Sequence, residues 1–532
     1  MGDTIQKFGV VSIEPGHGTG GRHPSRAGLD RPIGNQDPGM FGRMFPELPP
    51  MEIAKEKLDE LGAAMKDKAF DPAKPDEGNA SLPAGFTYLG QFIDHDITLD
   101  LTSLGDKSAD PDAIENFRTP ALDLDSIYGL GPDGSRPLYA RNDPTIVDGK
   151  PQFSGKRPGP KFFFGETVLG GPGNISDVFP NDLPRSPEGF ALIGDHRNDE
   201  NLLVAQTHLA LLKFHNKVCD QLAGKDIDVF KEARRIVTWH YQWMVLHDFV
   251  ERVTSPGIVA KILHDGRKFY RFRKFPYIPV EFSGVAYRFG HSMVRETYSH
   301  NRVFTRGGEG GPASLKLLFD FSGLSGVIVG DFTKKLPQGT FAFPSLPSNW
   351  VIDWRRYHDF SAFAANPDGV PLNRTRKIDP FLTPALHDLP GGGGNLASLN
   401  LRRGLLRGLP SGQDVAKAMG IKKPLTPDEI ATGSDGAVAK QHGMHEKTPL
   451  WYYILKEAEQ RGEGERLGPV GATIISEVFV GLVHGDHDSY LWLKGKDWKP
   501  DLPSAVPGTF TMADLLQFVG DVSPLDKVKT VP

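Results

Sequence analysis

Apolar residues recur at helical spacing along much of the chain. Residues 201–222 carry leucine and valine, and residues 230–250 carry isoleucine, tryptophan and leucine, at the three- to four-residue intervals of an amphipathic helix. Neither stretch contains glycine or proline, the residues that most often end or kink a helix. The pattern therefore predicts two long helices in the middle of the chain.

Shorter stretches with the same periodicity predict further helices on both sides of this pair. Phe86, Leu89, Phe92 and Ile93 share one side of a predicted helix over residues 86–98. Other predicted helices cover residues 51–68, 397–407, 413–419, 450–459 and 470–483, with a short one from Thr511, whose hydroxyl can cap it. A single short strand is predicted at residues 161–164. The predicted class is mostly α, with few short strands and long loops.

Composition sets the domain organisation and excludes several partners. Glycine and proline number 61 and 44 of 532 residues, which predicts many loops, but no linker divides the body. We expect an irregular N-terminal arm over residues 1–45, one large helical domain over 46–495, and a C-terminal extension over 496–532. A net charge of −5 gives no basic surface for nucleic acid.

The cysteine count and the apolar runs narrow the class further. The single cysteine, Cys219, excludes an intrachain disulfide, a cysteine-rich zinc site and an iron–sulfur cluster. The longest apolar run, residues 473–483, is far shorter than the roughly 20 residues that span a bilayer. The N-terminus has no signal-peptide pattern. We therefore expect a cytoplasmic protein, or one exported by a route without a signal.

The segment 90–96 combines polar chemistry with an apolar helix. Gln91 and His95 are four residues apart and share a helix face, while Asp94 lies beside that face and Asp96 points away. Two acids and a histidine within an apolar helix are costly unless they are paired, ligated or hydrogen-bonded. A hydrogen-bonded core histidine is the simpler interpretation, and a functional site is the alternative.

Residues 119–125 alternate oxygen-bearing side chains with apolar ones. In an extended loop this alternation points Thr119, Asp123 and Asp125 the same way, with backbone carbonyls between them. Several oxygens without sulfur or imidazole suit Ca²⁺, although the glycine and glutamate of an EF-hand loop are missing. The alternative is a solvated acidic loop.

Three more segments carry charged or imidazole side chains at fixed places. Arg197 and Glu200 precede the predicted helix over residues 201–222, which would hold them rigidly. Arg288 and His291 are three residues apart in a helical pattern, and residues 400–403 offer an amide and a guanidinium on one turn. By contrast, Gly16–Gly21 matches a dinucleotide-binding pattern without the helix that such a site needs.

In this order the segments resemble the animal-type haem peroxidases of the peroxidase–cyclooxygenase superfamily, from about residue 80 to about 495. Residues 211–216, 350–355 and 468–477 add to the resemblance, and the single cysteine suits a bacterial member. The resemblance implies one helical haem-peroxidase domain. Agreement of five separated segments in sequence and order makes it specific.

The resemblance implies a role for each candidate residue. His95 would be the distal histidine with Gln91 beside it, Arg197 the distal arginine, and His291 the proximal ligand of the haem iron. Asn400 would accept a hydrogen bond from the other ring nitrogen of His291. The remaining implied roles are propionate pairing for Arg288 and Arg403, ester links to haem b for Asp94 and Glu200, and Ca²⁺ ligation for Asp96, Thr119, Ala121 (through its carbonyl), Asp123 and Asp125.

The implied activity is reduction of hydrogen peroxide through a ferryl intermediate, with oxidation of small donors. These donors would be phenols, aromatic amines, bromide, iodide or thiocyanate. His95 would move the peroxide proton and Arg197 would stabilise the departing oxygen.

Departures from the family pattern refine this prediction. Asn201 stands where halide-oxidising members carry methionine, which argues against strong chloride oxidation. Residues 405–408 read Leu-Leu-Arg-Gly instead of the usual Arg-Asp-His-Gly. The oxygenase branch places a radical-forming tyrosine where this chain has Arg288, and Tyr287 is turned by about 100° from that position. The sequence therefore favours a peroxidase over a haem fatty-acid dioxygenase. A non-catalytic calcium-binding adhesion scaffold and a catalase-like peroxide scavenger are less favoured functions for the same scaffold.

Overall fold

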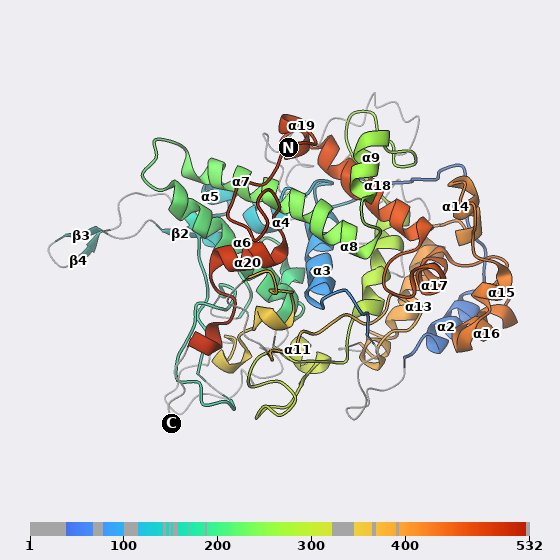
Figure 1. Ribbon diagram of the computed structural model, residues 1–532, viewed down its shortest axis with the longest axis horizontal. Helices are drawn as coiled ribbons and strands as arrows, with labels where there is room; N and C mark the ends of the chain where they lie inside the picture. Colours follow the sequence, from blue (N-terminus) through green and yellow to red (C-terminus); the bar gives the residue numbers. More distant parts are fainter. Residues whose placement is uncertain are drawn as a thin grey trace, which may run out of the picture.

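The computed structural model describes residues 39–67, 78–100, 115–141, 145–147, 150–152, 158–169, 171–186, 189–321, 345–363, 369–389 and 393–527. This part of the chain is predominantly helical and contains only short two-stranded ladders, so the predicted class is confirmed (Figure 1). The glycine pattern at residues 16–21 lies outside the described residues.

Two neighbouring helices form the centre of the fold. Helix α6, Leu202–Leu222, begins where Asn201 Oδ1 accepts a hydrogen bond from Val204 N at 2.9 Å, and most of its side chains are buried. Helix α7, Val229–Met244, packs against it, and α3, Gly85–Ile97, packs against α6 as well. All three helices were predicted from periodicity, because they lack proline and carry continuous apolar faces.

The end of the second long helix differs from the prediction. Helix α7 passes at Val245–Val250 into a π-helical segment, followed by α8, Glu251–Val253. The wider π turn places Phe249 against α3, where a Cβ at Gly90 would lie 3.1 Å from the Phe249 ring. Glycine at position 90 therefore permits the close approach of these two elements.

Two predicted boundaries were wrong. Helix α2 covers Lys55–Ala64 instead of residues 51–68, and beyond its C-terminal end Asp67 N donates to Leu382 O instead of continuing the helix. The strand predicted at 161–164 is β5, Pro158–Phe162. Its pairing with β2, Tyr139–Arg141, already begins at Pro158, which lies opposite Arg141. Beyond Phe162 the chain leaves the ladder.

The remaining elements are short or lie at the periphery. The other predicted helices are α13 Leu396–Leu406, α14 Gly412–Ala418, α17 Leu450–Gly462, α18 Pro469–Gly485 and α20 Met512–Val519. The helices that periodicity did not predict are α4 Asp125–Tyr128, α5 Gly131–Gly134, α9 Ile258–Asp265, α10 Val280–Ser283, α11 Leu315–Asp320, α15 Pro427–Ile430, α16 Gly433–Gln441 and α19 Tyr490–Lys494. The 3₁₀ turns are Arg136–Leu138, His196–Asp199, Ala286–Met293, Ser348–Trp350, Trp354–Arg356, Pro384–His387 and Pro524–Lys527.

The strands pair only locally. The parallel pair joins β1, Phe41–Gly42, to β6, Ile278–Pro279. The other pairs are antiparallel: β2 with β5, β3 Thr145–Val147 with β4 Lys150–Gln152, and β7 Thr297–Tyr298 with β8 Ala313–Ser314.

The C-terminal segment packs against the helical body. Thr511 and Asp514 form a reciprocal capping box at the start of α20, which confirms the predicted cap. Phe510 and Phe518 pack on Phe214 of α6, with ring centroids 5.5 and 5.6 Å away. At the other end, strand β1 attaches the last residues of the predicted N-terminal arm to the body.

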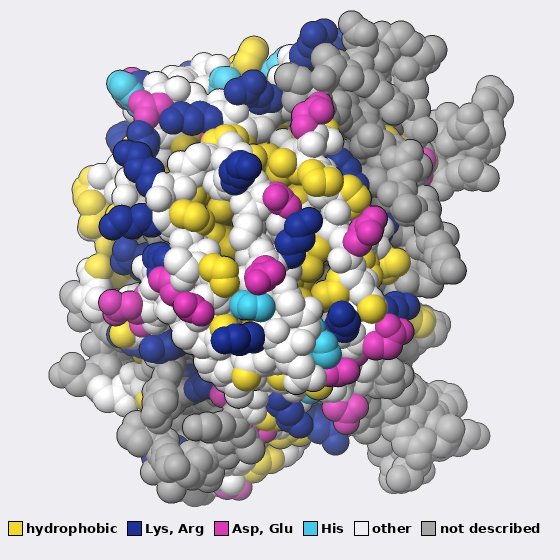
Figure 2. Space-filling model, turned by 90° about the vertical axis from the view of Figure 1, so that its right-hand side faces the viewer, with side chains coloured by type: hydrophobic (Ala, Val, Ile, Leu, Met, Phe, Trp, Pro, Cys, Tyr) yellow, Lys and Arg dark blue, Asp and Glu magenta, His cyan; other side chains and the backbone are white. Residues whose placement is uncertain are grey.

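The molecular surface agrees with the nearly balanced charge. On the face shown in Figure 2, basic and acidic side chains are interleaved, with small apolar areas between them. Within the described residues, no helix is long and apolar enough to span a membrane.

Candidate active site

A cavity of about 470 Å³ lies where α3, the turn before α6 and the 3₁₀ segment Ala286–Met293 meet. Among the side chains that line it are the predicted residues Gln91, Asp94, His95, Arg197, Glu200, Arg288, His291 and Arg403. A larger cavity of about 620 Å³, beside α9 and α18, is lined by none of the predicted site residues. The structure therefore gathers four separated sequence segments around one space.

His95 points into this cavity from α3, and a hydrogen bond to its Nδ1 orients the ring. Its Nδ1 lies 2.9 Å from Asn198 Oδ1, and Asn198 Nδ2 lies 3.0 Å from His208 Nδ1. An amide oxygen only accepts, so Nδ1 of His95 carries the hydrogen and Nε2 is a free base. Burial, reinforced by the charge of Arg197, lowers the pKa of His95 to about 3. The ring is therefore neutral at pH 7.

Arg197 is fixed by contacts to two elements. It lies in the 3₁₀ turn His196–Asp199, where Asp195 Oδ1 accepts from both its backbone N and its Nε, at 2.9 and 3.1 Å. Its Nη2 donates to Asp195 Oδ2 and to the carbonyls of His95 and Thr98, at 2.7, 3.0 and 2.6 Å. Arg197 is thus joined to the same helix end that carries His95.

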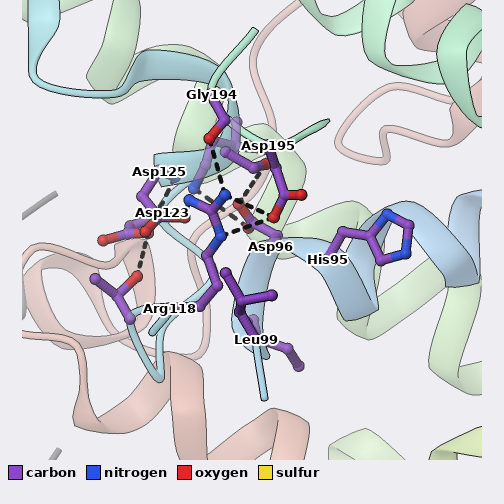
Figure 3. Close-up of polar contacts among 12 residues, drawn as sticks. His95, Asp96, Leu99, Arg118, Asp123, Asp125, Gly194 and Asp195 are labelled. Atoms are coloured by element: carbon purple, nitrogen blue, oxygen red, sulfur yellow. Dashed lines mark hydrogen bonds and ion pairs between the residues drawn. The ribbon is translucent and has the colours of Figure 1, made fainter. Parts of the chain in front are cut away.

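Asp195 connects Arg197 to a second arginine. Arg118 donates to Asp195 Oδ2 through Nε and Nη2, at 2.9 and 2.6 Å (Figure 3). Burial by itself would raise the pKa of Asp195. The charges of Arg118 and Arg197 have the larger effect and hold this pKa well below its usual range. Asp195 is therefore a carboxylate shared by two guanidinium groups.

His291 faces the cavity from the 3₁₀ segment, and its Nδ1 lies 2.8 Å from Asn400 Nδ2 on α13. The predicted pair is therefore brought together, but the amide nitrogen faces the ring where an accepting oxygen was predicted. Rotating the amide by 180° exchanges two atoms of similar size and restores the predicted direction. Burial, with the charges of Arg288 and Arg403, lowers the pKa of His291 to about 3, so its ring is neutral.

Positive charge accumulates beside His291. The charge of Arg288, together with burial, lowers the pKa of Arg403 to about 9, and burial lowers that of Arg288. Asp100 lies near this group and accepts from Arg403 Nη1 at 3.4 Å and from Arg407 Nη2 at 2.5 Å. Guanidinium groups that lie close enough for one to lower the pKa of the other are well placed to bind the carboxylates of a bound molecule.

Two acids and an amide complete the cavity wall. Burial raises the pKa of Asp94, whose Oδ1 accepts from Thr98 Oγ1 at 3.1 Å. Burial also raises the pKa of Glu200 to about 7. The side chain is nonetheless exposed, and the surface that it exposes faces the cavity. Gln91 Oε1 accepts from Asn201 Nδ2 at 2.9 Å, which links α3 to the start of α6.

An acidic cluster lies on the side of α3 away from His95 (Figure 3). Asp96, Asp123 and Asp125 are buried and offer oxygen atoms that lie within 4.8 Å of one another. Burial, then repulsion from Asp125 and Asp123, raises the pKa of Asp96 well above its usual value. Arg118 Nη1 lies 3.3 Å from Asp125 Oδ1. Three close buried carboxyls and one guanidinium leave a site suited to a cation.

The loop around this cluster has an uncommon backbone. Thr119 Oγ1 donates to Asp123 Oδ1 at 2.8 Å, and Ala121 lies buried between them in the sequence. Leu124 adopts a left-handed conformation, with φ +58°, and its N–H donates to Asp96 Oδ2 at 3.3 Å. Such strain in a non-glycine residue is typical of loops that present ligands. The predicted calcium residues therefore share one loop and one helix.

Sequence reasoning missed three residues that orient the site: Arg118, Asp195 and Asn198. Each lies next to a predicted residue or two residues from one, and their residue types were visible. Their partners are far away in the sequence, however: Arg118 and Asp195 are 77 residues apart, and His95 and Asn198 are 103 apart. Only the folded chain brings these pairs into contact.

Comparison with known proteins finds sequence similarity to one family. Residues 102–309 match the model of the animal haem peroxidase family. A peroxidase-like protein of Margaritifera margaritifera is 28% identical over 235 residues, 41% of this chain and 26% of that protein. The chorion peroxidase of Drosophila melanogaster is 24% identical over 399 residues, 71% of this chain and 42% of that protein. The chain thus spans less than half the length of these relatives.

Solved structures show the same fold. Peroxidase A of Dictyostelium discoideum superposes with a TM-score of 0.55 at 16% identity, covering 86% of this chain and 89% of that one. The fatty acid alpha-dioxygenase of Oryza sativa superposes with a TM-score of 0.53 at 16% identity, covering 92% of this chain and 80% of that one. At this identity the likeness concerns the fold alone.

Proposed function

Since this chain is related to the animal haem peroxidases in sequence and shares the fold of a solved peroxidase, we propose that it is a haem-dependent peroxidase. It reduces hydrogen peroxide and oxidises small donors: phenols, aromatic amines, bromide, iodide or thiocyanate. Its single cysteine supports a bacterial-type member of the family. One observation carries the proposal: two neutral histidines, His95 and His291, line one cavity together with Arg197.

The residues around the cavity fit haem b. His291 would ligate the iron, and Asn400 would hold its ring by the other nitrogen. Arg288 and Arg403 form the paired positive charge that the two propionates require. Asp94 and Glu200 supply the carboxyl groups for ester links. When bound, the haem supplies the redox chemistry, and the protein supplies ligation and orientation.

The protein's own groups would handle the proton and the charge. Nε2 of His95 is free because Asn198 fixes the hydrogen on Nδ1, so it can take the proton of bound peroxide and return it to the departing oxygen. Arg197, held by Asp195 and two carbonyls, would stabilise the negative charge on that oxygen. Gln91 is placed beside His95 by its contact with Asn201.

Calcium completes the proposal. Asp96, Thr119, the Ala121 carbonyl, Asp123 and Asp125 would bind Ca²⁺, which replaces the repulsion among the three acids by attraction. Because Asp96 follows His95 on α3, the ion would hold this helix against the loop that contains the other ligands.

The activity is tested on the full chain purified with a haem supply. We expect a Soret band and peroxide-dependent oxidation of a phenol such as guaiacol. His291→Ala should lose the band, whereas His215→Gln, a buried histidine of α6 outside the cavity, should keep both properties. Absence of the band in the unaltered protein, even after haem is added back, would contradict the proposal.

The ester links need a separate experiment. Acid–acetone extraction should leave the Soret band with the protein in the unaltered chain and release it from the double variant Asp94→Asn, Glu200→Gln. Full extraction from the unaltered chain would remove the ester claim and leave the peroxidase proposal intact.

Tyr287 favours a second candidate, a haem fatty-acid dioxygenase. It lines the cavity, and its hydroxyl donates to Gly90 O at 3.1 Å. Oxygen uptake with linoleate in the absence of peroxide, lost in Tyr287→Phe, would support this candidate. Uptake that requires added peroxide would support the peroxidase.

A further inference from the structure

Buried tyrosines lead away from the cavity wall in consecutive contact. Tyr88 of α3 lines the cavity, and its hydroxyl donates to the Tyr298 hydroxyl at 2.7 Å. The Tyr298 ring stacks on Tyr357, with centroids 5.9 Å apart and an interplanar angle of 28°. The three side chains are 4%, 1% and 1% exposed. An aromatic path without intervening solvent therefore runs from the cavity to Tyr357.

The path reaches a tyrosine that is paired with a base. The Tyr357 hydroxyl lies 3.0 Å from His300 Nδ1, and His300 Nε2 lies 2.9 Å from the Trp350 carbonyl. A carbonyl can only accept, so Nε2 carries the ring hydrogen and Nδ1 accepts from the phenol. Burial lowers the pKa of His300 to about 4, which leaves the ring neutral at pH 7. His300 can therefore receive the phenol proton.

This pairing differs from that of Tyr270 and Tyr277, and it is shared by Tyr128, whose hydroxyl lies 3.1 Å from His215 Nδ1 while His215 Nε2 lies 2.9 Å from the Pro160 carbonyl. Tyr270 donates to the Tyr277 carbonyl at 2.6 Å, and Tyr277 donates to the Arg43 carbonyl at 2.8 Å. A carbonyl satisfies a buried hydroxyl at low cost, but it cannot take up a proton at neutral pH. A histidine base suits a phenol that must release its proton when oxidised, and Tyr357 combines such a base with the path to the cavity through Tyr298 and Tyr88.

We propose that Tyr357, paired with His300, is a redox-active tyrosine that receives an oxidising equivalent from the cavity through Tyr88 and Tyr298. The inference rests on the proposed function, because the oxidant is peroxide-oxidised haem in the cavity. One electron leaves Tyr357 for that oxidant, and the phenol proton moves to His300 Nδ1. Tyr357 becomes a neutral phenoxyl radical and His300 an imidazolium. A one-electron donor such as a phenol or an aromatic amine later returns an electron, and the proton moves back.

The surroundings bear on both products of this step. Asp353, whose backbone N–H donates to the His300 carbonyl at 3.2 Å, acts to raise the pKa of His300 and so offsets part of the lowering by burial and by Arg356. Beyond His300, the ring of Trp350 lies 5.7 Å away and stacks on Phe304 and Phe321, with centroids 3.9 and 4.3 Å apart. The radical is thus enclosed by aromatic rings and separated from bulk water.

The test is freeze-quench electron paramagnetic resonance of the haem-loaded full chain, mixed with hydrogen peroxide and no donor. We expect a tyrosyl signal that narrows when the protein carries ring-deuterated tyrosine. Tyr357→Phe should abolish this signal while keeping the stacked ring. The control Tyr277→Phe removes a buried hydroxyl that donates to a carbonyl and should keep it. An unchanged signal in Tyr357→Phe would overturn the inference.

Two further variants keep the test decisive if Tyr357→Phe does not fold. His300→Gln removes the proton acceptor, and Tyr88→Phe removes the hydroxyl contact at the cavity wall; each should reduce the signal. Retention of the full signal in both would overturn the inference. A peroxide-induced change of the Soret band without a tyrosyl signal would overturn the inference alone. No spectral response to peroxide would overturn the proposed function and the inference with it.

Discussion

At the scale of single residues, Asn198 decides which nitrogen of His95 is the base. Its amide has one accepting and one donating end, and these meet His95 Nδ1 and His208 Nδ1. Reversing the amide would place a donor against the hydrogen of His95. With the amide in this direction, its oxygen accepts from His95 Nδ1 and so selects the tautomer of His95 that leaves Nε2 free.

Replacement of Asn198 tests this orientation. We expect Asn198→Leu to lower the second-order rate constant of the reaction with peroxide about 100-fold, because a catalytic base that is misplaced by about an ångström loses this much. Stopped-flow measurement of the Soret change after mixing with peroxide gives the rate constant. Asn216→Leu is the matched control, since its amide bridges to the backbone of Phe162 away from the cavity. Equal rate constants for Asn198→Leu and the unaltered protein would refute the role of Asn198.

At the scale of elements, two different faces of α3 contribute to two sites. His95 points into the cavity, and Asp96, the next residue, points into the acidic cluster, as a turn of about 100° per residue requires. The loop 118–125 reaches the same helix through Arg118, which binds the carboxylate that also holds Arg197. Binding of the proposed Ca²⁺ at the acidic cluster would therefore affect the placement of His95 and Arg197.

Calcium removal tests the proposed Ca²⁺ site. Chelation should lower the melting temperature, and an ion at about 100 times its dissociation constant contributes about 2.7 kcal/mol to stability. Asp123→Asn should abolish the difference between calcium-loaded and chelated protein. Asp59→Asn, which alters a surface ion pair with Arg402, should keep it. Calorimetry of the three proteins with and without calcium measures the effect, and identical responses of all three would rule out the proposed ligand.

The C-terminal segment provides a second prediction for an element. Phe510 is fully buried and stacks on Phe214 of α6. Phe510→Ala should lower the free energy of unfolding by roughly 3–5 kcal/mol, the usual cost of deleting a buried aromatic ring. Phe190→Ala removes a ring that is 74% exposed and should change it by less than about 0.5 kcal/mol. Urea denaturation measures both, and a small effect of Phe510→Ala would show that the segment packs loosely.

At the scale of the whole molecule, buried neutral histidines limit stability in acid. Burial lowers the pKa of His208 to about 3, and it lowers those of His95, His215, His291, His300 and His358 as well. The unfolded chain binds protons at these positions below about pH 6.5, whereas the native protein does not. Their contribution to stability is complete above pH 6.5 and is lost as the pH falls toward the native pKa values.

His208→Gln isolates one such contribution. Between pH 7 and 5 the haem-free unaltered protein should lose roughly 2 kcal/mol more stability than the variant, from a shift of about 1.4 kcal/mol per pH unit below 6.5. Urea denaturation of both proteins at the two pH values gives the difference. A parallel decline would mean that His208 titrates alike in the native and unfolded states.

Much of the architecture follows from the sequence itself. The central helices were predictable because Asn201 can cap α6 and because long apolar faces without glycine or proline have few alternatives to a helix. The shared face of Gln91 and His95 and the different direction of Asp96 follow from helical geometry alone. The residue types of the candidate site, and their order along the chain, were likewise visible.

Only the tertiary structure decided which of these groups meet, and in what state. That His95 and His291 line one cavity depends on how α3 and the 3₁₀ segment pack, which local periodicity does not encode. The tautomer of His95, the sharing of Asp195 by two arginines and the pairing of Tyr357 with His300 depend on contacts between distant segments. The physical reason is that side-chain direction and desolvation arise from packing, whereas periodicity specifies only which face of an element is buried.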